Sequence, residues 1–290
     1  MSEKRNITIG VDGSPDSIRA LDWAARYART HGAPLEVLTA VGWPGDTAVH
    51  GGYRIAELRD AARVDGQHTL DRMLERVTAA MPGLPVSGRL SNEPPAKALL
   101  HASSFSGLVI VGCRGLNPAA SLVLGSVSTV VTAHAECPVV VVRSDRQPGP
   151  DAPVVAGLTG TERDAATLDA AFAEADLAGA PLTVAHAWTD ATLVGVFGAS
   201  VVPSWIEARA EADALVRRQL AGWREKYPAA TVRTLVQRDG PAAMLQALAP
   251  EAGLVVVGSR GRGGFAGMLL GSVARRMVQH ASAPVLVVRG

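Results

Sequence analysis

The sequence LVIVGCRGLNPAASLVLGS, residues 108–126, decides the fold of this chain, and a second copy, LVVVGSRGRGGFAGMLLGS, follows at residues 254–272. Each copy opens with an apolar run typical of a buried strand and ends where a helix-like pattern begins. The glycines have the same spacing in both copies: Gly, two residues, Gly, nine residues, Gly-Ser. This pattern places glycines at the carboxyl end of a strand and Gly-Ser at the amino end of a helix.

A glycine-lined turn in front of a helix suits an anionic ligand. Glycine tolerates positive φ and lets backbone N–H groups approach a ligand without an intervening Cβ. The helix start leaves unpaired N–H donors and a partial positive charge, which favour a phosphate. Ser126 and Ser272 are candidates to cap the two helices and to offer a hydroxyl to a phosphate oxygen. The glycines could instead only permit a tight turn, but two copies at one spacing favour ligand binding.

The duplication extends along the whole chain. The matching pairs are NITIGVDGSPDS (6–17) with PVVAGLTGTERD (153–164), GAPLEVLTAV (32–41) with GAPLTVAHAW (179–188), and HAECPVVVVR (134–143) with HASAPVLVVR (280–289). The sequence therefore predicts two copies of one domain, at 1–144 and 153–290. The segment between them, 145–152, is polar and rich in Pro and Gly, as an exposed linker is expected to be.

Each copy alternates predicted strands and helices. In the first copy the predicted strands are 7–11, 35–41, 86–90, 108–111 and 139–143. Such Val/Ile/Leu-rich strands indicate an α/β fold, with a parallel sheet covered by helices on both faces. Ligands of these sheets bind beyond the carboxyl ends of the strands, where the strand order switches. We therefore expect Asp12-Gly13, Val41 and Gly112, which end three strands, to meet at one crevice.

Composition excludes several classes of function. A net charge of +1 over 290 residues argues against a nucleic-acid partner. The first residues lack an apolar signal core, and no stretch has the length of a membrane span, so we expect a cytoplasmic protein without a membrane partner. Two cysteines, Cys113 and Cys137, supply no disulfide or metal framework. The helix dipole and Arg114 could lower the pKa of Cys113, but its counterpart, Ser259, argues against a required thiol.

The spacing Gly-2x-Gly-9x-Gly-Ser, followed by a helix and a CPV- or APV-type strand, resembles the universal stress protein family. The resemblance covers nearly the whole chain as two tandem domains, and the VDGS opening and the HAW strand end support it. It implies two Rossmann-like domains of the adenine nucleotide alpha hydrolase-like type. Each would be a five-stranded parallel sheet of order 3-2-1-4-5 with helices on both faces. The resemblance also implies bound ATP, as in many members.

In such members the glycine motif holds the phosphates and ribose, an Asp after the first strand borders the nucleotide, and the backbone ending the second strand contacts the adenine. In the first half the resemblance assigns these contacts to Val11, Asp12, Gly13, Ser14, Val41, Gly112, Arg114, Gly115, Gly125, Ser126, Val127 and Ser128. In the second half it assigns them to Leu158, Thr159, Gly160, Trp188, Gly258, Arg260, Gly261, Gly271, Ser272 and Val273. None of these residues is predicted to be catalytic or to hold a resident metal.

The two halves are not identical at these positions. Thr159 replaces Asp12, and Ala274 replaces Ser128. An aspartate near a triphosphate would act through Mg²⁺, so its loss weakens a metal-assisted mode in the second half. Arg260 and Arg262 are candidate phosphate partners there. We therefore expect both halves to bind ATP, the first more securely.

Three functions stay open. The first is a nucleotide-dependent regulator in the stress response, with little or no turnover. The second is a weak ATP hydrolase, although the chain lacks a G-x-x-x-x-G-K-[ST] loop and a repeated nucleophile–base pair. The third is a nucleotide-free dimerisation scaffold, against which the intact glycines argue. Edge pairing of fifth strands, also implied by the resemblance, would make the two domains an internal pseudo-dimer, and we expect the chain to form a homodimer.

Overall fold

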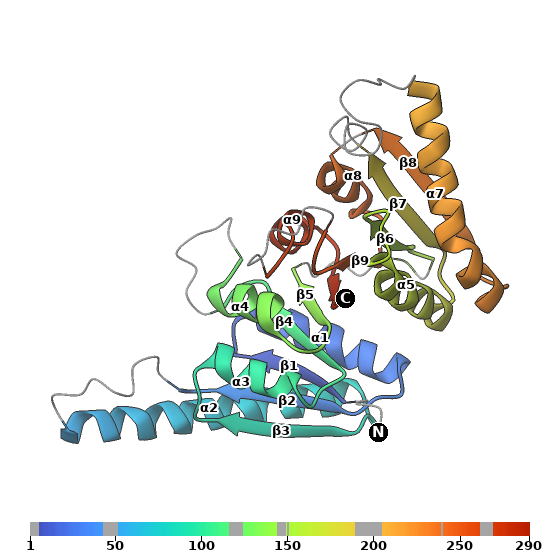
Figure 1. Cartoon of the computed structure of the whole chain (residues 1–290). Coiled ribbons are helices and arrows are strands. Elements are labelled where there is room, and N and C mark those ends of the chain that lie inside the picture. The colour runs from blue at the N-terminus through green and yellow to red at the C-terminus, as the bar shows by residue number, and fades with distance from the viewer. Residues whose placement is uncertain are drawn as a thin grey trace. The chain divides into compact units, whose positions relative to one another are not determined.

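The computed structural model describes residues 6–42, 52–115, 124–143, 149, 151–188, 205–238, 240–261 and 269–290. Arg262 and most of the predicted linker at 145–152 lie outside these ranges. The chain divides into two compact units, Met1–Arg143 and Ser144–Gly290 (Figure 1). Each unit is described by itself below.

The first unit alternates strands and helices along the chain. Its strands are β1 (Ile7–Val11), β2 (Leu35–Ala40), β3 (Val86–Ser91), β4 (Leu108–Gly112) and β5 (Val139–Val142). Its helices are α1 (Pro15–Thr30), α2 (Gly52–Ala80), α3 (Pro95–Ser103) and α4 (Ser126–His134). The strands pair in parallel in the order β3-β2-β1-β4-β5, which confirms the predicted fold class. Helices α1 and α2 pack together against the sheet, and α3 packs with α4.

The second unit repeats this plan. Its strands are β6 (Val154–Leu158), β7 (Leu182–Trp188), β8 (Val232–Arg238), β9 (Leu254–Gly258) and β10 (Val285–Val288). Its helices are α5 (Asp164–Ala178), α7 (Trp205–Lys226), α8 (Pro241–Leu248) and α9 (Ser272–His280). The parallel order β8-β7-β6-β9-β10 again corresponds to 3-2-1-4-5 within the unit.

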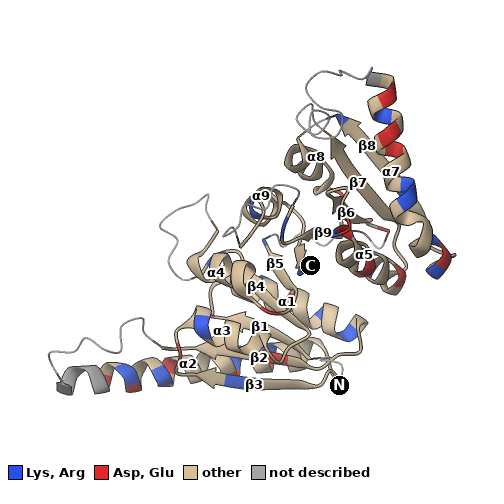
Figure 2. Cartoon of the chain, viewed as in Figure 1, with Lys and Arg blue, Asp and Glu red and all other residues tan. Residues whose placement is uncertain are grey.

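The central strands form the core of each sheet, as their apolar sequences require. All five residues of β4 are buried, and Ile9 of β1 is fully enclosed. Charged residues of both signs lie instead along α2 and α7 (Figure 2). Every helix within the described ranges is too short or too polar to cross a lipid bilayer.

The position of β1 creates the place for a ligand. It pairs with β2 on one side and with β4 on the other, so the strand order switches at β1. The chain leaves β1 through a turn in which Gly13 has φ 80°. Ser14 caps α1 and accepts a hydrogen bond from the Ser17 N–H at 3.2 Å, and Pro15 starts the helix.

Candidate functional site

A cavity of about 310 Å³ opens at the carboxyl edge of the first sheet, where β1, β2 and β4 end. This volume is at the lower end of the roughly 300–1,000 Å³ typical of small-ligand sites. The structure brings most of the predicted first-half residues to its walls. They are Val11, Asp12, Gly112, Arg114, Gly115, Gly125, Ser126, Val127 and Ser128.

Three predicted residues lie beside the cavity without lining it. Gly13 and Ser14 form the turn between β1 and α1. Val41 points at α2, because a Cβ added to Gly66 would lie 2.2 Å from its Cγ1. The sequence prediction also missed the lining residues Gly10, Ser17, Leu38, Ala40, Pro95, Leu99 and Val111. The alternation of side chains along a strand could have identified Gly10 and Leu38 as lining residues. The lining residues of α3 could not be identified in this way, because their position depends on how that helix packs on the sheet.

One end of the cavity is an apolar slot. Gly10, Leu38 and Val111 stand opposite each other in the registers of β1, β2 and β4, so they share one face of the sheet. Leu99 of α3 lies over this row, because a Cβ on Gly10 would be 2.9 Å from Leu99 Cδ1. The glycine therefore leaves room for the Leu99 side chain, and Pro95 is a further apolar lining residue.

The other end of the cavity is the start of α4. Gly125 is the N-cap residue of this helix, and no side chain caps the helix. The first intrahelical bond runs from the Thr129 N–H to the Gly125 carbonyl oxygen at 2.9 Å. The N–H groups of Ser126, Val127 and Ser128 come before this first bond in the chain. Like the other N–H groups at a helix N-terminus, they have no acceptor within the helix.

The predicted capping role of Ser126 and Ser272 is wrong. Gly125 and Gly271 occupy the N-cap positions of α4 and α9, and each serine is the first helical residue. A first-turn residue has helical backbone angles, so its hydroxyl is not placed to cap the following N–H groups. The helix therefore starts without a side-chain cap. Its free N–H groups favour the binding of an external anion more than they would if a serine capped the helix, as predicted.

Two motif glycines are required by close contacts. A Cβ on Gly115 would lie 2.6 Å from Asp12 Oδ2, so this glycine lets the loop pass directly over the carboxylate. A Cβ on Gly112 would lie 2.8 Å from the Asp16 carbonyl oxygen, so that glycine lets β4 approach α1. Gly112 is therefore needed for the packing of β4 on α1, whereas Gly115 shapes the cavity itself.

The polar side chains around the cavity are held in place. Asp12 Oδ1 accepts a hydrogen bond from the Ser14 N–H at 3.0 Å, which orients the carboxylate at the turn. The Ser128 hydroxyl donates to the Gly112 carbonyl oxygen at 2.6 Å, so its hydrogen is already used within the fold. The described residues contain no group of three or more His, Cys, Asp or Glu side chains that could hold a metal ion.

The pKa of the Cys113 thiol is raised and not lowered, contrary to what its position in the loop suggested. Cys113 is fully buried and does not line the cavity. Burial raises the pKa of the Cys113 thiol, and its hydrogen bond to Asp16 Oδ2 at 2.7 Å raises the pKa further. Arg114 lowers this pKa, as the sequence suggested, but its effect is the smaller one. The structure therefore makes Cys113 an inert packing residue.

In the second half the predicted residues lie at the corresponding strand ends and helix start. They occupy the end of β6 and its turn (Leu158, Thr159, Gly160), the end of β7 (Trp188), the end of β9 and its turn (Gly258, Arg260, Gly261) and the start of α9 (Gly271, Ser272, Val273). A separate small cavity of about 10 Å³ lies between the start of α5 and the ends of β9 and β10, and of these residues Gly258 and Arg260 line it. Residues 262–268, between Gly261 and α9, lie outside the described ranges.

The sequence model of the universal stress protein family matches residues 4–143 and again 152–289. This chain belongs to the universal stress protein family. A universal stress protein of Mycolicibacterium smegmatis is 37% identical over 293 residues, covering 98% of this chain and 96% of that protein. The crystal structure of a universal stress protein from Archaeoglobus fulgidus covers 99% of both chains, with a TM-score of 0.71 and 19% identity. A universal stress protein solved in complex with cAMP covers 49% of this chain and 98% of that chain, with 26% identity and a TM-score of 0.36.

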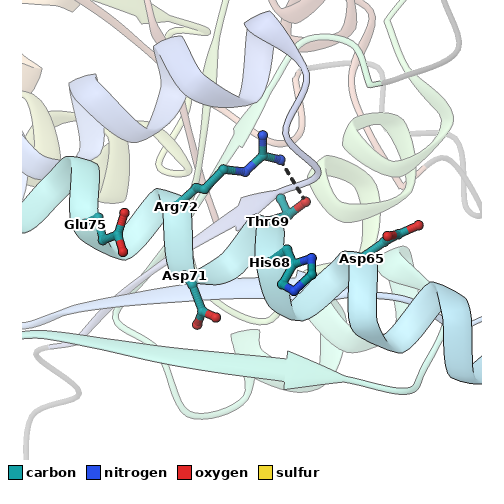
Figure 3. A pocket seen from close by; sticks show the side chains of 6 residues that line it. All are labelled: Asp65, His68, Thr69, Asp71, Arg72 and Glu75. Atoms are coloured by element: carbon teal, nitrogen blue, oxygen red, sulfur yellow. Dashed lines mark hydrogen bonds between the residues drawn. The ribbon is translucent and has the colours of Figure 1, made fainter.

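This universal stress protein also has an open hollow of about 560 Å³ along α2. Its lining residues all come from that one helix: Asp65, His68, Thr69, Asp71, Arg72 and Glu75. Figure 3 shows that these side chains fan out instead of converging, with Arg72 bonded to Thr69 at 3.3 Å. The hollow is therefore an open helix surface, and the cavity at the strand ends is the better candidate site.

Proposed function

We propose that this universal stress protein binds an adenine nucleotide, ATP in particular, in the first-half cavity and acts as a nucleotide-dependent regulator in the stress response. One observation carries the proposal: a single cavity joins an apolar slot to a helix start that has no side-chain cap. A nucleotide has the same division, because its base is flat and largely apolar on its faces while its phosphates are anionic.

The slot at Gly10, Leu38 and Leu99 would take the base. The phosphates would lie at the start of α4, where orphan N–H groups and the helix dipole favour negative charge. Arg114, whose side chain is 38% exposed, is close enough to the cavity to contribute a charged donor. Mg²⁺ would enter with ATP, held by Asp12 and by phosphate oxygens, since hard cations prefer oxygen ligands.

The lining residues favour binding over turnover. Asp12 is the one residue with a carboxylate side chain among the described lining residues. The described lining residues include no histidine that could act as a general base for a serine nucleophile. A fast hydrolase needs a nucleophile and a base in mutual reach. We therefore propose little or no turnover, with weak ATP hydrolysis or a nucleotide-free dimerisation scaffold as the alternatives.

The proposal extends to location and assembly. Cys113 and Cys137 are free thiols, which suits the reducing cytoplasm. The edge strand of each five-stranded sheet is wholly apolar, VVVV in β5 and VLVV in β10. Apolar edges favour pairing with another strand, so we propose that the two domains pair through these strands as an internal pseudo-dimer and that the chain forms a homodimer. Light scattering of the purified chain, with and without ATP, tests the assembly.

Calorimetric titration of the full chain with ATP, AMP and cAMP, in Mg²⁺ and in EDTA, tests the nucleotide site. We expect Gly115→Ala to weaken ATP binding at least about tenfold, because the new Cβ would collide with Asp12. The matched control is Gly261→Ala in the second motif, where an added Cβ meets no described residue within 4 Å. If the unaltered chain binds no nucleotide, the proposed nucleotide site is refuted. If the chain releases phosphate from ATP at about 1 s⁻¹ or faster, as ordinary enzymes do, the proposed role as a regulator with little turnover is refuted.

A further inference from the structure

The small cavity between α5, β9 and β10 is lined by two arginines and two buried hydroxyl groups. Arg163 and Arg260 line it together with Thr167 and Ser259. Thr167 is 1% exposed and Ser259 is 4% exposed, so both hydroxyls belong to the interior of the second unit. The cavity is separate from the proposed nucleotide site, which lies in the first unit.

These side chains lack the partners that buried polar groups normally have. Within the described ranges, the hydroxyls of Thr167 and Ser259 make no hydrogen bond. Arg163 donates to the Gly261 carbonyl oxygen at 3.3 Å, but among the described residues neither Arg163 nor Arg260 forms an ion pair. Buried hydroxyls without a partner in the protein commonly mark the place of a water molecule or an ion.

The carboxylate that follows Arg163 in the chain is engaged elsewhere. Asp164 Oδ2 accepts hydrogen bonds from the N–H groups of Gly160 and Thr161, at 2.6 and 3.0 Å. The side-chain amide of Gln219, on α7, donates to the same oxygen at 3.2 Å. Asp164 is therefore held in the turn between β6 and α5, and it does not neutralise Arg163.

The first unit has a carboxylate of its own at the matching place. Asp16 aligns with Arg163 in the repeat, and its side chain is 13% exposed. Asp16 Oδ2 accepts a hydrogen bond from the Cys113 thiol at 2.7 Å and lies 3.6 Å from Arg114 Nε. Asp16 Oδ1 is paired with Arg19. In the first unit, therefore, the chain itself supplies the anion that this arginine pairs with.

Three residues differ between the units at this place, and each difference adds a cation or a hydroxyl donor to the second unit. Arg163 replaces Asp16, Thr167 replaces Ala20 and Ser259 replaces Cys113, while Arg260 keeps the arginine of Arg114. Hydroxyl groups donate hydrogen bonds, and the planar guanidinium fork matches the oxygens of a phosphate or a carboxylate. The second unit thus combines the donors of an oxyanion site without an anion of its own.

The volume of the cavity limits how an anion would enter it. About 10 Å³ holds one water-sized group, so one oxygen atom fits inside, between the two buried hydroxyls. Arg163 and Arg260 are exposed, and they lie where the remaining oxygens would face solvent. A tetrahedral oxyanion such as phosphate has this shape, with one oxygen for the interior and others for the guanidinium groups.

We propose that Arg163, Arg260, Thr167 and Ser259 form a binding site for a phosphate-type oxyanion. The bound anion bridges the start of α5 to the residues that follow β9, as Asp16 bridges α1 to Arg114 in the first unit. The site goes beyond the proposed function, because it lies in the other unit and needs neither a base nor a ribose.

Equilibrium dialysis of the full chain against radiolabelled inorganic phosphate tests the site. We expect Arg163→Asp, which gives the second unit a carboxylate like Asp16, to bind one phosphate fewer per chain than the unaltered protein. Arg217→Asp is the matched control, since it makes the same change of charge at an exposed position of α7 and should leave the number unchanged. Equal numbers in Arg163→Asp and the unaltered chain, or no phosphate bound by the unaltered chain at millimolar concentration, would overturn the proposal.

Thr167→Val tests the site without a change of charge. Valine keeps the shape of threonine but lacks the hydroxyl, so we expect the affinity for phosphate to fall about tenfold, the loss of one hydrogen bond to a charged group. The urea midpoint in phosphate-free buffer should not fall, because the hydroxyl has no partner among the described residues. Unchanged phosphate affinity in this variant would contradict the assignment.

Chloride at the same ionic strength distinguishes an oxyanion site from a general attraction for anions. We expect chloride to leave the bound phosphate in place, and full displacement would overturn the assignment to an oxyanion. The decisive quantity is the difference in bound inorganic phosphate between the unaltered chain and Arg163→Asp. It is measured without nucleotide, so this proposal and the proposed nucleotide site can fail separately.

Discussion

The buried Ser128 hydroxyl donates a 2.6 Å hydrogen bond to the carbonyl oxygen of Gly112, which ties the first turn of α4 to the end of β4. These are the two elements between which the proposed phosphate site lies. The second half has the buried Ala274 at this place and therefore lacks the bond. The two glycine motifs thus differ in how firmly their helix start is attached to the sheet.

Ser128→Ala is expected to lower the free energy of unfolding by about 1 kcal/mol, because a buried carbonyl loses a hydrogen-bond donor. Urea unfolding followed by circular dichroism measures the change. Ser104→Ala is the control, since its hydroxyl donates to Glu136 at 2.9 Å in an exposed pair and its removal should cost less than about 0.5 kcal/mol. If the free energy of unfolding falls equally in the two variants, the buried hydrogen bond between α4 and β4 contributes no more to stability than the exposed one.

Gly66→Ala in α2 is expected to destabilise the protein, against the usual helix preference. Alanine in a helix interior normally gains up to about 1 kcal/mol over glycine. At Gly66, however, the added Cβ would lie 2.2 Å from Val41 Cγ1, and such overpacking costs about 1–3 kcal/mol. Gly222→Ala in α7, where an added Cβ meets no atom of the described residues within 4 Å, should instead stabilise the protein. Urea midpoints compare the two variants, and Val41→Ala should relieve the loss in Gly66→Ala.

Asp12→Asn should remove the Mg²⁺ dependence of ATP binding. Asparagine keeps the side-chain oxygen that accepts from the Ser14 N–H, so the turn should persist, but it lacks the charge that favours a hard cation. We expect the affinity for ATP in Mg²⁺ to fall about tenfold, to its value in EDTA, with AMP binding unchanged. Calorimetry with both nucleotides measures this, and an equal fall for AMP would show that Asp12 acts through the structure of the turn.

Cys113 should resist alkylation in the folded protein. Burial raises its pKa, so the unreactive thiol form persists to higher pH than in the unfolded chain. The thiol therefore contributes stability that is complete below the unfolded pKa of about 8.5 and is lost as pH rises through the higher folded pKa. Iodoacetamide labelling at pH 7.5, read by mass spectrometry, should modify Cys113 only in urea. Rapid labelling of the native protein would contradict this burial effect.

Much of the fold follows from local sequence patterns. The apolar runs at 7–11 and 108–112 are long enough for buried strands, and the spacing of Gly112, Gly115 and Gly125 places a turn between strand and helix. Ser14-Pro15, a capping residue followed by a first-turn proline, stands at the start of α1. These features depend on neighbours in the chain, and for that reason they could be predicted without the structure.

Contacts between distant residues decided the rest. The sequence alone determined two α/β domains and the glycines at the end of each fourth strand. Only the tertiary structure placed Leu99 over Gly10, put Gly125 at the helix cap, and buried Cys113 beside Asp16. It also brought Gln219 to Asp164, 55 residues away, around a carboxylate enclosed by its own turn. Burial and hydrogen-bond geometry depend on how helices pack on the sheet, and no local pattern records that packing.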